Sequence, residues 1–343
     1  MVLAMMAVKN LRWSWALPAL LIPAALAVLW QELGFGAQAA VMAPDRVVAV
    51  SAQPLDGAGT TIGPLRLVAA VQLTSPDPGF GGISGLAARD DGELVAVTDA
   101  GQWLALGVGL ADGRLAGIAH ARMASFAAGA EKSDLDAEAI VLSPGGRTLI
   151  SLEQRHRILV LAGQQPPFRP EGTIFRTAAA DWPSNGGGEA LALLPDGHML
   201  WVSEQARQSD GHAAALLTGT DNRTRAIAVP VPKGFAPTDA TPLDGHRLLV
   251  LNRKFDGVSV EAAITLVDLA PVLAGGGTAT MRLLARWGAG SAWPVDNMEG
   301  LTLVRSGGRT LLYVVSDDNF SAAQRTILLQ LELVSPVDAA QSP

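Results

Sequence analysis

A hairpin that recurs five times constrains the fold of this chain more than any other feature of its sequence. The clearest copy reads DAEAIVLSPGGRTLISLEQ over residues 136–154, two apolar segments around Gly145-Gly146, where a tight turn needs positive φ. The copies follow one another at intervals of roughly 50 to 60 residues, and a period near 50 is typical of a four-stranded propeller blade. Their opening residues are Ser84, Glu138, Glu189, Asp239 and Glu299.

The repeats predict an all-β fold, a β-propeller of about five four-stranded blades. A third apolar stretch follows each hairpin, and a fourth follows in most copies. The fifth copy lacks a fourth stretch, so we expect residues 65–73 (LRLVAAVQL) to supply it and to close the ring, because closure removes an exposed sheet edge. Six blades are the alternative, if residues 41–75 and part of a long connection build another blade.

The amino terminus is a separate, hydrophobic segment. Lys9 and Arg12 precede an apolar run of 18 residues, from Trp13 to Trp30, and Ala37-Gln38-Ala39 follows as a candidate cleavage motif. The pattern predicts an export signal helix, but the run is long enough to span a bilayer, so an uncleaved anchor and a buried core helix stay open as alternatives. We therefore expect residues 1–39 to be a signal peptide or membrane anchor, 40–64 a linker, 65–335 the propeller and 336–343 a disordered tail. The expected location is the bacterial periplasm, either free or anchored in the inner membrane.

Charge and cysteine content exclude several function classes. The net charge is −7 and no long basic run occurs, which argues against nucleic acid as a partner. The chain has no cysteine, so it has no disulfide and no thiolate-ligated zinc. We expect a monomer that acts on, or binds, a small molecule.

Carboxylates occupy the two ends of nearly every hairpin. Eight of the ten opening and closing positions are Asp or Glu, although these types make up only 32 of 343 residues. With a two-residue turn, Glu138 would lie directly opposite Glu153, and the opening and closing residues of the first and third hairpins would face each other in the same way. In the fourth and fifth hairpins these residues are out of register by about two residues and one residue, which indicates a bulge or a longer turn. In a propeller both ends lie at one rim of the central channel. The closing residues are Asp99, Glu153, Glu204, Asn252 and Asp317.

Crowded carboxylates at one rim repel one another by roughly 1 kcal/mol a pair even in water, so something must compensate them. A hard cation such as Ca²⁺ takes oxygen ligands from several elements. Basic side chains could interleave, and some acids could keep protons through raised pKa values, which would make them general acids. In a purely structural alternative, the acids accept backbone N–H groups from the neighbouring blade. The nearest basic residues in the sequence are Lys132, Arg155, Arg157, Arg253 and Lys254.

Several of these segments resemble one family. They match the phytase-like domain, labelled "esterase-like activity of phytase", over about residues 60–335. The resemblance implies an exported bacterial propeller whose acidic residues serve phosphoester hydrolysis. Two departures are that Thr98-Asp99-Ala100-Gly101 lacks the expected Arg, and that Asn252 stands where an acid is usual. The matching segments are Gly82-Ile83-Ser84-Gly85-Leu86, Asp136-Ala137-Glu138-Ala139, Gly188-Glu189-Ala190-Leu191, Asn297-Met298-Glu299-Gly300-Leu301 and Ser316-Asp317-Asp318-Asn319-Phe320.

Two functions are consistent with this sequence. The first is an exported phosphoric ester hydrolase with a Ca²⁺ site at the channel mouth, acting on a small-molecule phosphoester. Glu153, Glu204 or Asp99 would be the general base, and Arg155 and Arg253 would hold the phosphate. The second is a non-catalytic periplasmic binding or scaffold propeller whose acidic rim locks the blades together. The predicted metal ligands of the first are Glu138, Glu189, Asp239, Glu299, Asp317 and Asp318.

Overall fold

The computed structural model describes residues 45–126, 135–175, 179–335 and 337. The predicted signal or anchor segment, residues 1–39, lies outside these ranges, as does all but one residue of the predicted tail. Within the described ranges, no helix is both long and apolar enough to cross a membrane. The only helix described there is the single turn α2 (Ala270–Leu273).

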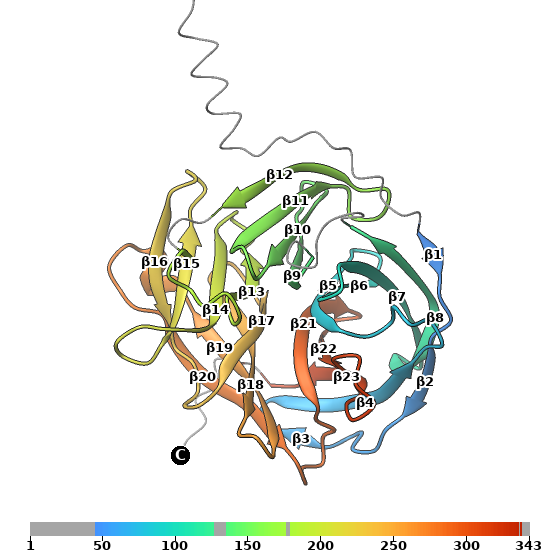
Figure 1. Ribbon diagram of the computed structural model, residues 1–343. Coiled ribbons are helices and arrows are strands. Elements are labelled where there is room, and N and C mark those ends of the chain that lie inside the picture. The colour runs from blue at the N-terminus through green and yellow to red at the C-terminus, as the bar shows by residue number, and fades with distance from the viewer. Residues whose placement is uncertain (1–44, 127–134, 176–178, 336, 338–343) are drawn as a thin grey trace, which may run out of the picture. The chain divides into compact units, whose positions relative to one another are not determined.

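Five antiparallel sheets surround a central channel as the blades of a propeller (Figure 1). The innermost strand of each blade contacts the innermost strands of both neighbouring blades, so the ring is closed. The prediction of five blades is confirmed, and the six-blade alternative is wrong. The inner strands, in blade order, are β5 (Ile83–Ala88), β9 (Ala137–Leu142), β13 (Gly188–Leu193), β17 (Ala236–Pro242) and β21 (Asn297–Ser306).

Each blade continues outward through a second, a third and a fourth strand. The second strands are β6 (Leu94–Thr98), β10 (Arg147–Leu152), β14 (Met199–Arg207), β18 (Arg247–Phe255) and β22 (Arg309–Asp317). The third strands are β7 (Gln102–Ala111), β11 (Arg157–Ala162), β15 (Ala213–Thr218), β19 (Val260–Asp268) and β23 (Thr326–Leu333). The fourth strands are β8 (Arg114–Ser125), β12 (Arg169–Phe175), β16 (Thr224–Val229), β20 (Thr280–Gly288) and β4 (Leu65–Thr74).

The strand β4, from the beginning of the described chain, completes the last blade by pairing with β23. This is the predicted closing strand. Three short strands come from within residues 40–64, which the sequence predicts as a linker, and they extend the outer edges of two blades. These strands are β1 (Arg46–Val47), paired with β8, and β2 (Ser51–Pro54) and β3 (Thr61–Ile62), both paired with β4.

The hydrophobic core lies between the blades. Five clusters of buried side chains occur, and each combines residues from two adjacent blades. Aromatic pairs mark three of these interfaces: the ring centroids are 5.7 Å apart for Trp103 and Phe168, 5.2 Å for Trp182 and Trp201, and 5.4 Å for Trp287 and Trp293. The apolar packing that stabilises the fold therefore lies between the blades. Polar side chains line the channel mouth, at the hairpin ends where the inner strands begin.

The hairpins differ from the predicted register in two steps. In the second blade, Ser143 pairs with Arg147 across a turn of three residues, with Gly146 at φ 75°. A β-bulge then follows, because Ala139 lies opposite Ser151 and Ala137 opposite Leu152, which leaves Glu138 as the extra residue. Glu138 therefore does not lie directly opposite Glu153, contrary to the prediction.

The true partner of each closing acid lies two residues before the bulge. The N–H of Glu153 donates to the carbonyl of Asp136 at 2.9 Å. Asp99 pairs in the same way with Gly82, and Glu204 with Gly187. A longer turn and a bulge thus recur in all three hairpins that the sequence predicted to be regular, and each bulge turns a polar side chain toward the channel mouth.

The seam that closes the ring supplies a stability test. Leu67 of β4 lies opposite Leu331 of β23, and both are fully buried in one cluster. We expect Leu67→Ala and Leu331→Ala each to lower the free energy of unfolding by about 2–5 kcal/mol in urea titrations. Because the two side chains contact each other in one cluster, the double variant should lose less free energy of unfolding than the two single variants lose together. Val47→Ala, at a position 80% exposed, is the control; strictly additive losses at the seam would contradict the contact.

Candidate active site

A cavity of about 740 Å³ opens at the end of the channel where the inner strands begin. Among the residues that the structure describes, nine carboxylates and one guanidinium line it. The cavity brings together eight of the residues predicted from the sequence to form the site. These are Asp99, Glu138, Glu153, Glu189, Glu204, Arg253, Glu299 and Asp317.

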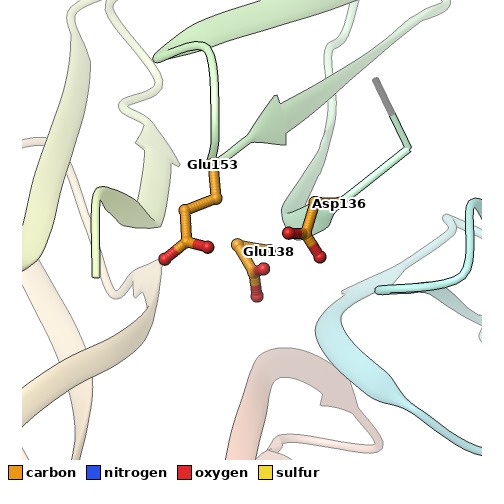
Figure 2. A group of neighbouring side chains, drawn as sticks. All are labelled: Asp136, Glu138 and Glu153. Atoms are coloured by element: carbon orange, nitrogen blue, oxygen red, sulfur yellow. The ribbon is translucent and has the colours of Figure 1, made fainter. Parts of the chain in front are cut away.

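Three of the carboxylates converge on one point. One oxygen from each of Asp136, Glu138 and Glu153 lies within 4.8 Å of the others, and Figure 2 shows the three side chains meeting in front of the strand ends. The register explains why this happens in the second blade, since only there does an acid stand opposite the closing acid. The corresponding residues in the other blades are Gly82, Gly187, Ala236 and Asn297.

Asp136 was not among the predicted ligands. The prediction placed Glu138 opposite Glu153 and therefore gave Asp136 no role. The alternation of the strand was the available signal, because residues two apart point to the same face of a strand.

Backbone N–H groups of the third blade hold Glu153. Its Oε1 accepts a hydrogen bond from Gly186 and another, at 3.3 Å, from Gly187. Gly186 adopts φ 92°, a left-handed conformation that suits glycine and helps to turn two successive N–H groups toward one acceptor. Glu153 is thus both a tie between two blades and a member of the acidic cluster.

The fourth blade places a cation where the other blades place an acid. Its bulge falls at Thr238, because Pro237 lies opposite Asn252 and Asp239 opposite Leu251. The counterparts of the opening and closing acids are therefore Thr238 and Arg253, one residue away from the predicted Asp239 and Asn252. Sequence alone missed this shift, since an acid and an amide happen to stand at the neighbouring positions.

Arg253 forms two ion pairs across the cavity. Its Nη2 lies 2.9 Å from Oε1 of Glu204, and its Nε lies 3.1 Å from Oε1 of Glu299. Burial opposes the charge of Arg253, but Glu299 and Glu204 outweigh it and raise the pKa of the guanidinium. The predicted phosphate-binding residue is therefore already a counter-ion for two rim acids.

Asp239 and Asp318, two predicted ligands, do not line the cavity. Asp239 is 1% exposed, and its carboxylate accepts N–H groups of Ala240 at 2.8 Å, Leu86 at 3.3 Å and Leu301 at 2.7 Å. These bonds tie together the inner strands of the first, fourth and last blades. Asp318 accepts the N–H groups of Gly82 and Phe320, both at 3.0 Å, and the hydroxyl of Thr326.

Arg155, the other predicted phosphate-binding residue, is exposed on the turn that follows Glu153 and does not line the cavity. The structure therefore separates the predicted pair of arginines, and only Arg253 reaches the site.

Burial perturbs the acids that remain. It raises the pKa of Glu138 well above its usual range, with further contributions from Glu153 and Asp136, and it raises that of Glu189, with Glu138 contributing. The pKa of Glu299 rises to about 8 and that of Asp317 to about 7, in both cases mainly through burial. Glu189 is 8% exposed and, within the described part of the chain, has no hydrogen bond or ion pair.

Comparisons with known proteins agree with the resemblance noted in the sequence. The family model described as "Phytase-like: Esterase-like activity of phytase" matches residues 78–320. No curated protein matches the chain.

Three of the solved structures that match are distant from this chain in sequence. The Swd1 (Cps50) β-propeller domain of Myceliophteria thermophila is 10% identical, with a TM-score of 0.39, and the match covers 84% of this chain and 99% of that one. A Trichoderma reesei carbohydrate-active enzyme of family AA12 is 11% identical, with a TM-score of 0.42 and coverage of 81% and 97%. An inactive virginiamycin B lyase from Staphylococcus aureus is 10% identical, with a TM-score of 0.38 and coverage of 83% and 99%. At these TM-scores the matches carry no argument about this chain.

The raised pKa values predict how stability changes with pH. In the unfolded chain Glu299 and Asp317 lose their protons near 4.5 and 3.8, whereas in the folded protein they keep them to about 8 and 7. The folded state therefore binds more protons than the unfolded state, and the free energy of unfolding falls as pH rises, from about 5 to 8 for Glu299 and from about 4 to 7 for Asp317. The fall is on the order of 1 kcal/mol per pH unit for each group. Urea titrations in metal-free buffer should show this fall, and the double variant Glu299→Gln, Asp317→Asn should flatten it. Equal slopes for the two proteins would contradict the assignment.

Arg253 supplies a second test of these electrostatics. We expect Arg253→Gln to lower the free energy of unfolding by about 3 kcal/mol at pH 8.5, because Glu204 and Glu299 lose their shared counter-ion inside the cavity. At pH 5 the loss should be smaller, since Glu299 then carries a proton in both proteins. Arg286→Gln, which removes one partner of the more exposed Glu261, is the matched control and should cost less than about 1 kcal/mol. The same loss at both pH values would show that the guanidinium stabilises through packing instead.

Proposed function

The chain belongs to the phytase-like family, described as having esterase-like activity of phytase, and from that premise we propose that it is an exported, periplasmic phosphoester hydrolase whose active site is the acidic cavity. The observation that carries the proposal is the convergence of Asp136, Glu138 and Glu153 within 4.8 Å. Carboxylates at this spacing repel one another unless a cation or protons compensate them, and here two are half-buried and the third, Glu153, is buried.

The residues present fit a calcium ion. Ca²⁺ prefers carboxylate and carbonyl oxygens from several chain segments, and the cluster offers three carboxylates from the two sides of one hairpin. Asp136, Glu138 and Glu153 would hold the ion, with Glu189 beside them as a buried acid that has no hydrogen bond or close ion pair in the described chain. A bound Ca²⁺ would polarise a phosphoryl oxygen and stabilise the charge that develops on it.

The chain's own acids would move the protons. Of the three predicted bases we assign the role to Asp99, because it lines the cavity and lies near enough to Asp317, the proposed acid, to raise the pKa of Asp317. Glu204 forms an ion pair with Arg253, and Glu153 belongs to the acidic cluster and accepts backbone N–H groups. Asp99 takes a proton from the attacking water as the new bond to phosphorus forms. Asp317, protonated near neutral pH, gives its proton to the alcohol oxygen as the ester bond breaks.

A second candidate function is a non-catalytic binding or scaffold propeller. The backbone hydrogen bonds of Asp239, Asp318 and Glu153 favour it, because each of these acids ties together segments that are distant in the sequence. Those bonds account for three acids. They leave Glu138 and Glu189 without a structural partner in the described chain, and this difference favours the hydrolase.

The test combines turnover with metal binding. We expect purified protein to hydrolyse phosphomonoesters or phosphodiesters in Ca²⁺ and to melt at a higher temperature when Ca²⁺ is added. Glu138→Gln should reduce turnover by about 100-fold and abolish the shift in melting temperature, because it removes the central carboxylate of the cluster. Asp239→Asn is the control, which should lower stability yet keep the response to Ca²⁺. No turnover, together with no metal-dependent shift, would leave the scaffold function in place of the hydrolase.

A further inference from the structure

One wall of the acidic cavity is apolar. The tip of the β18–β19 hairpin reaches its mouth, where Phe255 and Val260 lie opposite each other at the last pair of the ladder and both line the cavity. The neighbouring pair of the ladder, one step further from the turn, is Lys254 and Glu261. These two residues form an ion pair of 2.8 Å, and neither lines the cavity. Strand alternation thus directs the apolar pair inward and the charged pair outward.

The tip is held in one conformation by its own turn. Oδ1 of Asp256 accepts the N–H of Val258 at 3.0 Å and that of Ser259 at 2.8 Å, and Oδ2 accepts the hydroxyl of Ser259 at 2.9 Å. A turn with three such bonds is preorganised, and it joins the two strand ends that carry Phe255 and Val260.

Phe255 is unusually exposed for an aromatic side chain beside so many charges. Its exposed fraction is 61%, and its partner Val260 is half-buried. Water against this wall is unfavourable, and an apolar group that covered it would gain hydrophobic contact. The carboxylates below would meanwhile hold the polar end of the same molecule through a cation.

The charge of the cavity limits which phosphoesters it can accept. Among the described residues Arg253 is the only basic side chain that lines it, and it is already paired with Glu204 and Glu299. A compound with several phosphates would bring more negative charge against nine carboxylates. A single phosphate held through one divalent cation is the better match.

We infer that Phe255 and Val260 form a subsite for the alcohol portion of the ester, and that the preferred substrates are monophosphate esters of apolar, aromatic or alkyl, alcohols. This inference rests on the proposed function and names its substrate class. It makes Phe255 and Val260 specificity-determining residues that take no part in the proton transfers.

Paired substrates test the subsite. We would compare 1-naphthyl phosphate, glycerol 2-phosphate and inositol hexakisphosphate in Ca²⁺, using Phe255→Ser and Val260→Ser. Val258→Ser is the matched control, since Val258 is 95% exposed on the same turn and does not line the cavity. We expect Phe255→Ser to lower kcat/KM for naphthyl phosphate about 10-fold, mainly through KM, and to leave glycerol phosphate unchanged. Inositol hexakisphosphate should be the poorest substrate of the wild-type protein.

Binding separates this inference from the proposed activity. The non-hydrolysable 1-naphthylphosphonate would be titrated by calorimetry into wild type and Phe255→Ser with Ca²⁺ present. If no ester is hydrolysed but the phosphonate binds about 10-fold more weakly to Phe255→Ser, the subsite stands and the hydrolase does not. If esters are hydrolysed but the variant affects all three equally, or none, the subsite is overturned and the hydrolase stands. Absence of both turnover and phosphonate binding would overturn the subsite as well.

Discussion

Repulsion among the carboxylates at the channel mouth is the interaction that the rest of the site must accommodate. The fold can tolerate it because the five apolar clusters lie between the blades and away from the rim. The acids are then compensated in different ways. Arg253 pairs with Glu204 and Glu299, and backbone N–H groups saturate Asp239. Glu138 and Glu189 have neither kind of partner in the described chain, and burial raises the pKa of both.

The overall architecture could be predicted because it depends on patterns that repeat. The period of about 50 residues predicts blades, the five copies predict their number, and the missing fourth strand of the last copy predicts that residues 65–73 close the ring. Each of these inferences uses hydrophobic stretches several residues long. Such stretches tolerate an error of one residue in alignment without changing the conclusion.

The details of the site could not be predicted in the same way, because they depend on single residues. One extra residue in the turn and one in the bulge moved the partner of Glu153 from Glu138 to Asp136. A shift of one residue exchanged Asp239 and Asn252 for Thr238 and Arg253 as the rim residues of the fourth blade. Turn length and bulge position follow from backbone geometry and packing, which the spacing of charged residues does not reveal. The apolar pair Phe255 and Val260 gave no signal, since two hydrophobic residues near a hairpin turn are common.

In a repeat protein, features shared by all blades are best explained by the fold, and features confined to one blade need another explanation. The bulge at the start of each inner strand is shared, and so it belongs to the architecture of the hairpin. Asp136, Arg253 and the tip that carries Phe255 each depart from the repeat, and all three meet at one cavity. Asp136 concentrates negative charge at one point of the cavity, Arg253 neutralises negative charge at another, and Phe255 adds an apolar wall. The repeat itself requires none of these departures, so under the proposed function they indicate the active end of the channel more specifically than the ring of acids does.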